Sequence, residues 1–176
     1  MKYNYLTKSQ IDAFIQAALQ EDVRDGDHST LASVPKDAQK KAHLLVKDEG
    51  IIAGLDLAKY IFDAVEPNLK IDFRIKDGEY VRHGDIAFIV SGNARAILTA
   101  ERLVLNCMQR MSGIATYTHN VMQLLKDTDC KILDTRKTTP NARLIEKWAV
   151  KIGGGENHRF GLFDMIMLKD NHCDFT

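Results

Sequence analysis

Residues 132–169 read ILDTRKTTPNARLIEKWAVKIGGGENHRFGLFDMIMLK, and this stretch decides the fold class. Short apolar segments at its two ends, residues 132–134 and 165–168, are typical of strands. Apolar residues at helical spacing between them predict a helix. Thr139 is expected to cap this helix, Pro140 to take its first position, and the glycine run to end it. Strand, helix and strand in this order predict a parallel crossover unit of an α/β protein.

The residues before this unit predict a small layered arrangement of helices and strands. Thr7 to Gln10 reads as a capping box, and the apolar spacing that follows indicates a helix running to about Asp22. Further strands are expected near residues 42–46, 71–75, 80–81 and 86–90, and further helices over 55–65 and 99–126, the last with a break or kink at Ser112-Gly113.

Composition excludes several classes of protein. The 176 residues carry 24 Lys and Arg against 24 Asp and Glu, so no global basic field for nucleic acid is implied. The three cysteines, Cys107, Cys130 and Cys173, include no CxxC pair, which fits a reducing compartment better than a zinc site or a disulfide framework. Residues 1–5 resemble no secretion signal and no run approaches a membrane span, so we expect a cytoplasmic protein.

Cationic side chains stand at the ends of the predicted strands. Arg136 and Lys137 follow the first strand, His158 and Arg159 follow the glycine run, and Lys169 follows the second strand. Ligands of parallel α/β folds bind outside the carboxyl ends of strands, and helix N-termini favour anions. These positions therefore predict a site for a small, highly charged anion. On spacing alone, solvated surface charges remain an equal alternative.

Two other interpretations of this region are weaker. Residues 153–157, GGGEN, follow a helix and lack the spacing of a P-loop or a dinucleotide fingerprint, so they indicate a helix end and a flexible turn. His158 and His172 have no carboxylate or cysteine at a ligand spacing, so they do not predict a metal site.

Several separated motifs resemble those of the quinolinate phosphoribosyltransferases. They are ERLVLN at 101–106 with QRMSGIAT at 109–116, DTRKTTP at 134–140, EKWAVKIGGGENHRFGL at 146–162, KDNH at 169–172 and, more weakly, the turn at 21–27. They follow the family's order over essentially the whole chain. The resemblance implies an N-terminal α/β sandwich domain, residues 1–113 with the start of the long helix, and then the first part of an incomplete α/β barrel, residues 114–176.

The resemblance also implies an activity and a set of binding residues. The family transfers phosphoribose from phosphoribosyl pyrophosphate, accompanied by Mg²⁺, to quinolinate, with decarboxylation to nicotinate mononucleotide. Its members are homodimers or dimer-based hexamers. Matched motif by motif, the quinolinate pocket consists of Arg136, Lys137, His158, Arg159 and Lys169, with Thr135 adjoining and Arg102 reaching into the neighbouring subunit's site. No protein nucleophile is required, and we assign no acid–base residue.

The chain departs from the family in length. The family's barrel continues beyond the KDNH motif, and its later strands carry the acidic metal and ribose ligands. We therefore expect an N-terminal fragment of a longer enzyme, or a truncated gene product, without metal ligands of its own. A second hypothesis is a non-catalytic anion-binding or assembly module of the same family. A third is a phosphoribosyltransferase, or a related accessory protein, for another base, although the number of cations favours a dicarboxylate over nicotinate.

Overall fold

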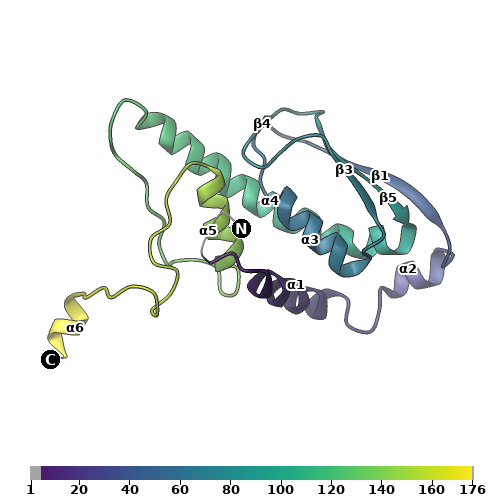
Figure 1. The fold of residues 1–176 in the computed structure, drawn as a ribbon, viewed down its shortest axis with the longest axis horizontal. Helices are drawn as coiled ribbons and strands as arrows, with labels where there is room; N and C mark the ends of the chain where they lie inside the picture. The colour runs from purple at the N-terminus through teal and green to yellow at the C-terminus, as the bar shows by residue number, and fades with distance from the viewer. Residues whose placement is uncertain (1–4, 176) are drawn as a thin grey trace.

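The N-terminal part of the chain is built on an antiparallel sheet. In a computed structural model, which describes residues 5–175, β1 (Gln39–Leu45), β5 (Ile86–Asn93) and β3 (Lys70–Phe73) lie side by side in that order (Figure 1). The central strand β5 pairs with both neighbours, so Val90 stands opposite Ala42 on one side and Ile71 on the other. A separate pair joins β2 (Gly50–Ile51) to β4 (Tyr80–Val81).

Four helices complete one hydrophobic core with this sheet. They are α1 (Lys8–Asp22), α2 (His28–Ser33), α3 (Leu55–Val65) and α4 (Ala94–Leu124). Helices α3 and α4 pack against the sheet, whereas α1 packs on α3 and α2 packs on α4. The apolar face of α3 packs against the sheet, where the ring of Phe62 meets that of Phe88 edge-on at 5.8 Å between centroids. The bounds of α3 and the capping box of Thr7 and Gln10 on α1 confirm the prediction, whereas α2 lies in a stretch for which no helix is predicted.

The long helix α4 joins the two halves of the chain. Its 31 residues run without interruption through Ser112 and Gly113, so the predicted break is wrong. One glycine costs a helix only about 1 kcal/mol, and the buried face of α4, with Met108, Met111 and Ala115, offsets that cost. The mixed α/β class is confirmed, and the helix passes through residue 113, where the sequence motifs change from one predicted domain to the next.

Two hydroxyl groups of α4 bind the backbone of β2 and of the segment that follows it. Thr116 Oγ1 accepts from Ile51 N at 2.9 Å, and Ser112 Oγ accepts from Ala53 N at 2.9 Å and donates to Ala53 O at 3.2 Å. A Cβ atom at Gly50 would lie 2.4 Å from the Thr116 hydroxyl, so this approach requires glycine. The motif that contains Ser112 and Thr116 thus fastens the N-terminal layer to α4.

Asp77 caps α3 from outside the helix. Its carboxylate accepts from Leu55 N at 2.8 Å and from Asp56 N at 3.2 Å, and Gly54, the residue before the helix, has φ +100° and no side chain to do so. Burial raises the pKa of Asp77 to about 6, although the two backbone donors favour the ionised form.

The second half of the chain contains the beginning of a parallel crossover. Leu133 forms a parallel bridge with Glu156, and α5 (Arg143–Ile152) connects them. The helix ends at the glycine run as predicted, and its apolar face is buried. The predicted start of the helix is wrong, because residues 139–142 form a turn closed by Ala142 N donating to Thr139 O at 3.1 Å. That turn delays the first helical residue to Arg143.

The second strand of the crossover is also misplaced in the prediction. Residues 165–168 form no strand; they are exposed in a segment that extends away from α5 and leads to α6 (Asp170–Asp174) (Figure 1). An apolar run becomes a strand only when another backbone pairs with it. Within residues 5–175 the pairing partner of Leu133 is Glu156 instead. The barrel is therefore represented by one bridged pair and one helix, and the described residues close no barrel.

A buried ion pair holds this crossover together. Lys147 Nζ contacts Asp134 Oδ1, and the two side chains are only 1% and 7% exposed. Asn157 Nδ2 donates to Asp134 Oδ2 at 2.6 Å and to Lys147 O at 2.9 Å. The positive charge of Lys147 on α5 is thus paired inside the protein with the negative charge of Asp134, which follows Leu133. Among the helices of the described residues, none combines the length and the apolar character needed to cross a membrane.

We expect the stability of the chain to depend on pH through Asp77. The folded state binds this proton more tightly than the unfolded chain, whose reference pKa is 3.8, so the free energy of unfolding should fall by about 3 kcal/mol as the pH rises from about 4 to above 6. Asp77→Asn should lack this part of the pH dependence. Urea unfolding of both proteins across that range tests it, and parallel pH profiles would contradict it.

Breaking the buried ion pair should destabilise the chain strongly. Lys147→Met leaves the Asp134 carboxylate buried without its cation, which should cost about 3–5 kcal/mol of unfolding free energy. Adding Asp134→Asn should recover part of that loss. The matched control is Lys59→Met, which removes an exposed pair with Asp63 and should change stability by less than about 1 kcal/mol. Similar losses for the two lysine variants in denaturant unfolding would disprove the prediction.

Candidate functional site

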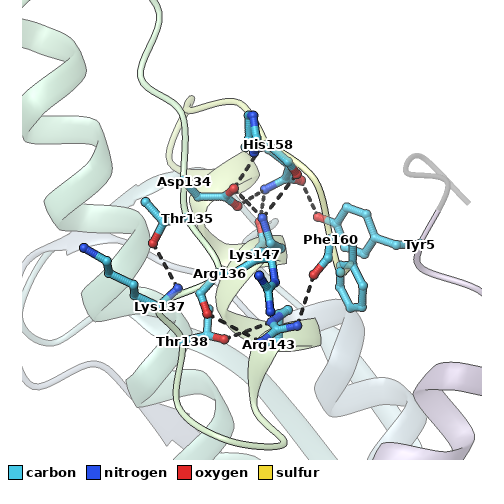
Figure 2. A network of polar contacts seen from close by, with 12 residues as sticks. Tyr5, Asp134, Thr135, Arg136, Lys137, Thr138, Arg143, Lys147, His158 and Phe160 are labelled. Atoms are coloured by element: carbon cyan, nitrogen blue, oxygen red, sulfur yellow. Dashed lines mark hydrogen bonds and ion pairs between the residues drawn. The ribbon is translucent and has the colours of Figure 1, made fainter. Parts of the chain in front are cut away.

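The first segment of the site, residues 134–138, begins at the buried ion pair. Asp134 is fixed by its contacts to Lys147 and Asn157, and the chain then leaves the interior (Figure 2). Thr135 Oγ1 accepts from Lys137 N at 3.0 Å, which forms a tight local turn. Thr135 and Lys137 are exposed. The first segment therefore exposes two of the predicted ligand residues, Thr135 and Lys137, on a backbone that the contacts of Asp134 hold in place.

The second segment of the site, residues 157–160, lies beside the first. His158 N donates to Asp134 Oδ1 at 2.9 Å, and the carbonyl of His158 accepts from Lys147 Nζ at 3.2 Å. From the N-terminal part, Tyr5 Oη donates to Asn157 Oδ1 at 2.6 Å, and the Tyr5 ring stacks on Phe160 at 5.1 Å between centroids. Residues 157–160 are thus held from both sides, and the backbone of His158 is placed by the same carboxylate that anchors the first segment.

Two arginines of the site are largely withdrawn from solvent. Arg159 is 7% exposed and Nη1 donates to Met165 O at 3.1 Å. Arg136 is partly buried, and its Nε is a buried donor with no acceptor among the described residues. Buried donors are nearly always satisfied in folded proteins, so an orphan one marks a position suited to an acceptor from a ligand. A carboxylate is the acceptor that a guanidinium fits best.

A second ion pair supports the turn at residues 138–140. Glu146 Oε1 accepts from Arg110 Nε at 3.0 Å and from Nη2 at 2.7 Å, while Glu146 Oε2 accepts from Thr139 N at 3.2 Å. Burial alone would raise the pKa of Glu146, but the hydrogen bonds from Arg110 and Thr139 outweigh it and hold the pKa below its usual value. Glu146 therefore stays ionised and ties α4, α5 and the first segment together.

The structure gathers part of the predicted set. Two segments that lie side by side carry Thr135, Arg136, Lys137, His158 and Arg159. Arg102 is exposed on α4, two helical turns before Arg110, and lies outside the network of Figure 2. Lys169 is exposed directly before α6, at the end of the segment that extends away from α5 (Figure 1). The expectation that Lys169 follows a strand at the same rim is wrong, because residues 165–168 form no strand.

The gathered cations are not neutralised by neighbouring carboxylates. Among residues 5–175, no Asp or Glu oxygen lies within 4.0 Å of the charged groups of Arg136, Lys137 or Arg159, and the nearby Asp134 and Glu146 are each occupied by another cation. A cluster of unpaired cations on a protein of zero formal charge produces a local positive field. This arrangement suits a small anion with several charges.

The supporting residues of the site were not predicted. Asp134, Arg143, Glu146 and Lys147 lie beneath the cation-bearing segments and fix their backbones. One signal was available in the sequence, because Glu146 and Lys147 interrupt an apolar helical face. The structure buries these two residues together with the rest of residues 144–149. Charged residues are almost never fully buried unless paired, so their position indicates partners elsewhere in the chain.

Metal binding has no support in the described part of the chain. No group of three or more His, Cys, Asp or Glu side chains gathers there at distances that suit a metal ion. Burial raises the pKa of the Cys107 thiol to about 11, so this cysteine stays protonated and unsuited to metal or nucleophilic chemistry at neutral pH.

Two family models match the chain in sequence. The N-terminal domain of quinolinate phosphoribosyl transferase matches residues 27–112, and the C-terminal domain of the same family matches residues 114–176. The Arabidopsis thaliana chloroplastic nicotinate-nucleotide pyrophosphorylase [carboxylating] is 52% identical over 163 residues, which are 92% of this chain and 46% of the relative. A probable nicotinate-nucleotide pyrophosphorylase [carboxylating] of Bacillus subtilis is 45% identical, over 86% of this chain and 52% of the relative.

Solved structures show the same likeness in three dimensions. NadC from Streptococcus pyogenes superposes with a TM-score of 0.90 at 43% identity, over 98% of this chain and 61% of that protein. A human nicotinic acid phosphoribosyltransferase shares the fold alone, with a TM-score of 0.55 at 14% identity. The chain spans about half the length of the curated relatives it matches. Both of its halves match the two domains of one family in order, and the chain belongs to the quinolinate phosphoribosyltransferase family.

Proposed function

We propose that this chain supplies the quinolinate-binding part of an enzyme that forms nicotinate mononucleotide, pyrophosphate and carbon dioxide from quinolinate and phosphoribosyl pyrophosphate. The observation that carries the proposal is the cluster of unpaired cations around Arg136, whose buried Nε has no acceptor among the described residues. Quinolinate bears two adjacent carboxylates, which need two neighbouring sets of donors. The segments that carry Arg136 and Arg159 offer such a pair.

The residues of this chain act in the proposed reaction by binding and orientation. The guanidinium groups hold the two carboxylates and leave the ring nitrogen free to displace pyrophosphate from the ribose. Once that nitrogen is quaternised, it stabilises the carbanion that remains when the adjacent carboxylate is lost as carbon dioxide, and a proton from water then takes the place of the lost carboxylate. Neither step requires a protein nucleophile, and we assign no acid–base residue.

The metal of the proposed reaction does not fit the described residues of this chain. Mg²⁺ would accompany phosphoribosyl pyrophosphate and stabilise the negative charge of the leaving pyrophosphate. Residues 5–175 hold no cluster of acidic or histidine side chains suited to it, so we derive no step from the metal here. We propose that its ligands come from the substrate and from residues other than those described.

Assembly, domain division and location also remain proposals. We propose a homodimer or a dimer-based hexamer in which the exposed Arg102 reaches a neighbouring subunit's site, and a division into domains at residue 113. A cytoplasmic location stays a prediction, since relatives from Arabidopsis thaliana and Nicotiana tabacum carry chloroplastic or mitochondrial names. A purely non-catalytic module is the less favoured alternative, because the relatives are named as enzymes.

Replacing Arg136 should weaken quinolinate binding selectively. Arg136→Gln removes a charge-assisted contact to one carboxylate, which corresponds to a roughly 10- to 100-fold rise in the quinolinate Kd. Nicotinate, which has a single carboxylate, should lose less. Calorimetric titration of both ligands measures this, with Arg82→Gln, an exposed arginine outside the site, as the matched control. Equal losses for the two ligands, or no quinolinate binding by the unmodified chain, would contradict the proposal.

A further inference from the structure

Arg143 makes an unusual set of contacts at the start of α5. Its Nε donates to Thr138 Oγ1 at 3.0 Å, its Nη1 to the carbonyl of Phe160 at 3.2 Å, and its Nη2 to the carbonyl of Arg136 at 3.4 Å (Figure 2). The proposed function assigns no role to this side chain. Three separate nitrogens of one guanidinium thus reach three separate acceptors.

The acceptors of Arg143 belong to both cation-bearing segments. Arg136 and Thr138 lie on the first segment, and Phe160 directly follows the pair His158 and Arg159 on the second. One rigid, planar group therefore spans the gap between the two segments. On the opposite side of the gap, Asp134 joins the same segments through the N–H of His158. The two segments are consequently held at both ends of their facing stretch.

The contacts of Arg143 are not those of an ordinary surface ion pair. No carboxylate of residues 5–175 lies within 4.0 Å of its guanidinium, and all of its hydrogen-bond acceptors are neutral oxygens. Its charge adds to that of the neighbouring cluster, which would repel it unless the three acceptors held it in place. Lysine would keep the charge but could not reproduce the flat fork that reaches three acceptors.

We propose that Arg143 is a positioning residue that fixes the spacing between the Arg136 and the His158–Arg159 segments and so adapts the site to two adjacent carboxylates. The side chain acts on the ligand through the two backbones that it joins. The part of this inference that concerns the ligand rests on the proposed function, whereas the joining of the two segments does not.

Amide hydrogen exchange tests the joining without any ligand. In Arg143→Lys, exchange should become at least about fivefold faster in both segments, measured over residues 135–138 and 158–161, because the first loses two hydrogen bonds to Arg143 and the second loses one, each of roughly 1 kcal/mol. Residues 147–152 of α5 should stay protected, which shows that the fold is intact. The matched control, Arg95→Lys, alters a guanidinium that binds the carbonyls of Val34 and Leu31 and should leave both segments unchanged.

A second variant keeps the test decisive if Arg143→Lys fails to fold. Thr138→Val removes only the acceptor of Arg143 Nε, so exchange should increase in residues 135–138 and less in residues 158–161. Unchanged exchange in both segments of folded Arg143→Lys, or of Thr138→Val where the first variant does not fold, would overturn the inference.

Ligand binding separates positioning from charge. Arg143→Lys keeps the positive charge, so a purely electrostatic role would leave the quinolinate Kd within about twofold, whereas loss of spacing should raise it about tenfold and affect nicotinate less. Faster exchange together with no quinolinate binding by the unmodified chain would refute the proposed function and leave the joining role of Arg143 standing. Faster exchange with an unchanged quinolinate Kd would overturn the role of the spacing in binding.

Discussion

The buried contact between Lys147 and Asp134 is the interaction on which the site depends. Burying two charges is costly, and the cost is met only when every remaining donor and acceptor finds a partner. Here Asn157 and the N–H of His158 complete the carboxylate, and the carbonyl of His158 completes the ammonium. Those partners lie on the second cation-bearing segment, and Asp134 itself begins the first. The pair therefore stabilises the crossover and sets the position of both segments at once.

Helix α4 transmits the order of the N-terminal layer to the site. Ser112 and Thr116 bind the backbone next to β2, and Arg110, on the same helix, binds Glu146 of α5. The polar residues of one motif thus face two different partners. This division explains why the helix continues through Ser112 and Gly113: a break there would disconnect Arg110 from the hydroxyl groups that fasten the helix to the sheet.

Local sequence predicted those elements whose cause is local. The bounds of α3, the capping box at Thr7 and the buried face of α5 follow from spacing and capping chemistry, which act within a few residues. The strand expected at residues 165–168 required a neighbour that a run of apolar letters cannot specify. The cap expected at Thr139 failed because residues 139–142 form a turn, closed by Ala142 N donating to Thr139 O, and the helix begins only at Arg143. The cations of the site were visible in sequence, but the pairing partners of the carboxylates beneath them were not, since partners 13 to 36 residues apart leave no local pattern.

The site also shows how a protein of zero formal charge gathers cations that form no ion pair in one region. Three acidic residues near the two segments are each paired with a cation: Asp134 with Lys147, Glu146 with Arg110 and Glu156 with Lys151. A fourth, Asp164, accepts hydrogen bonds from the backbone N–H groups of Phe160 and Gly161 instead. In each of these ion pairs the cation neutralises a carboxylate that would otherwise be available to the cations of the two segments. Arg136, Lys137, Arg143 and Arg159 therefore form no ion pair among the described residues, although acidic and basic residues are equal in number over the chain. The anion preference of the site thus arises as much from where the carboxylates are held as from where the cations stand.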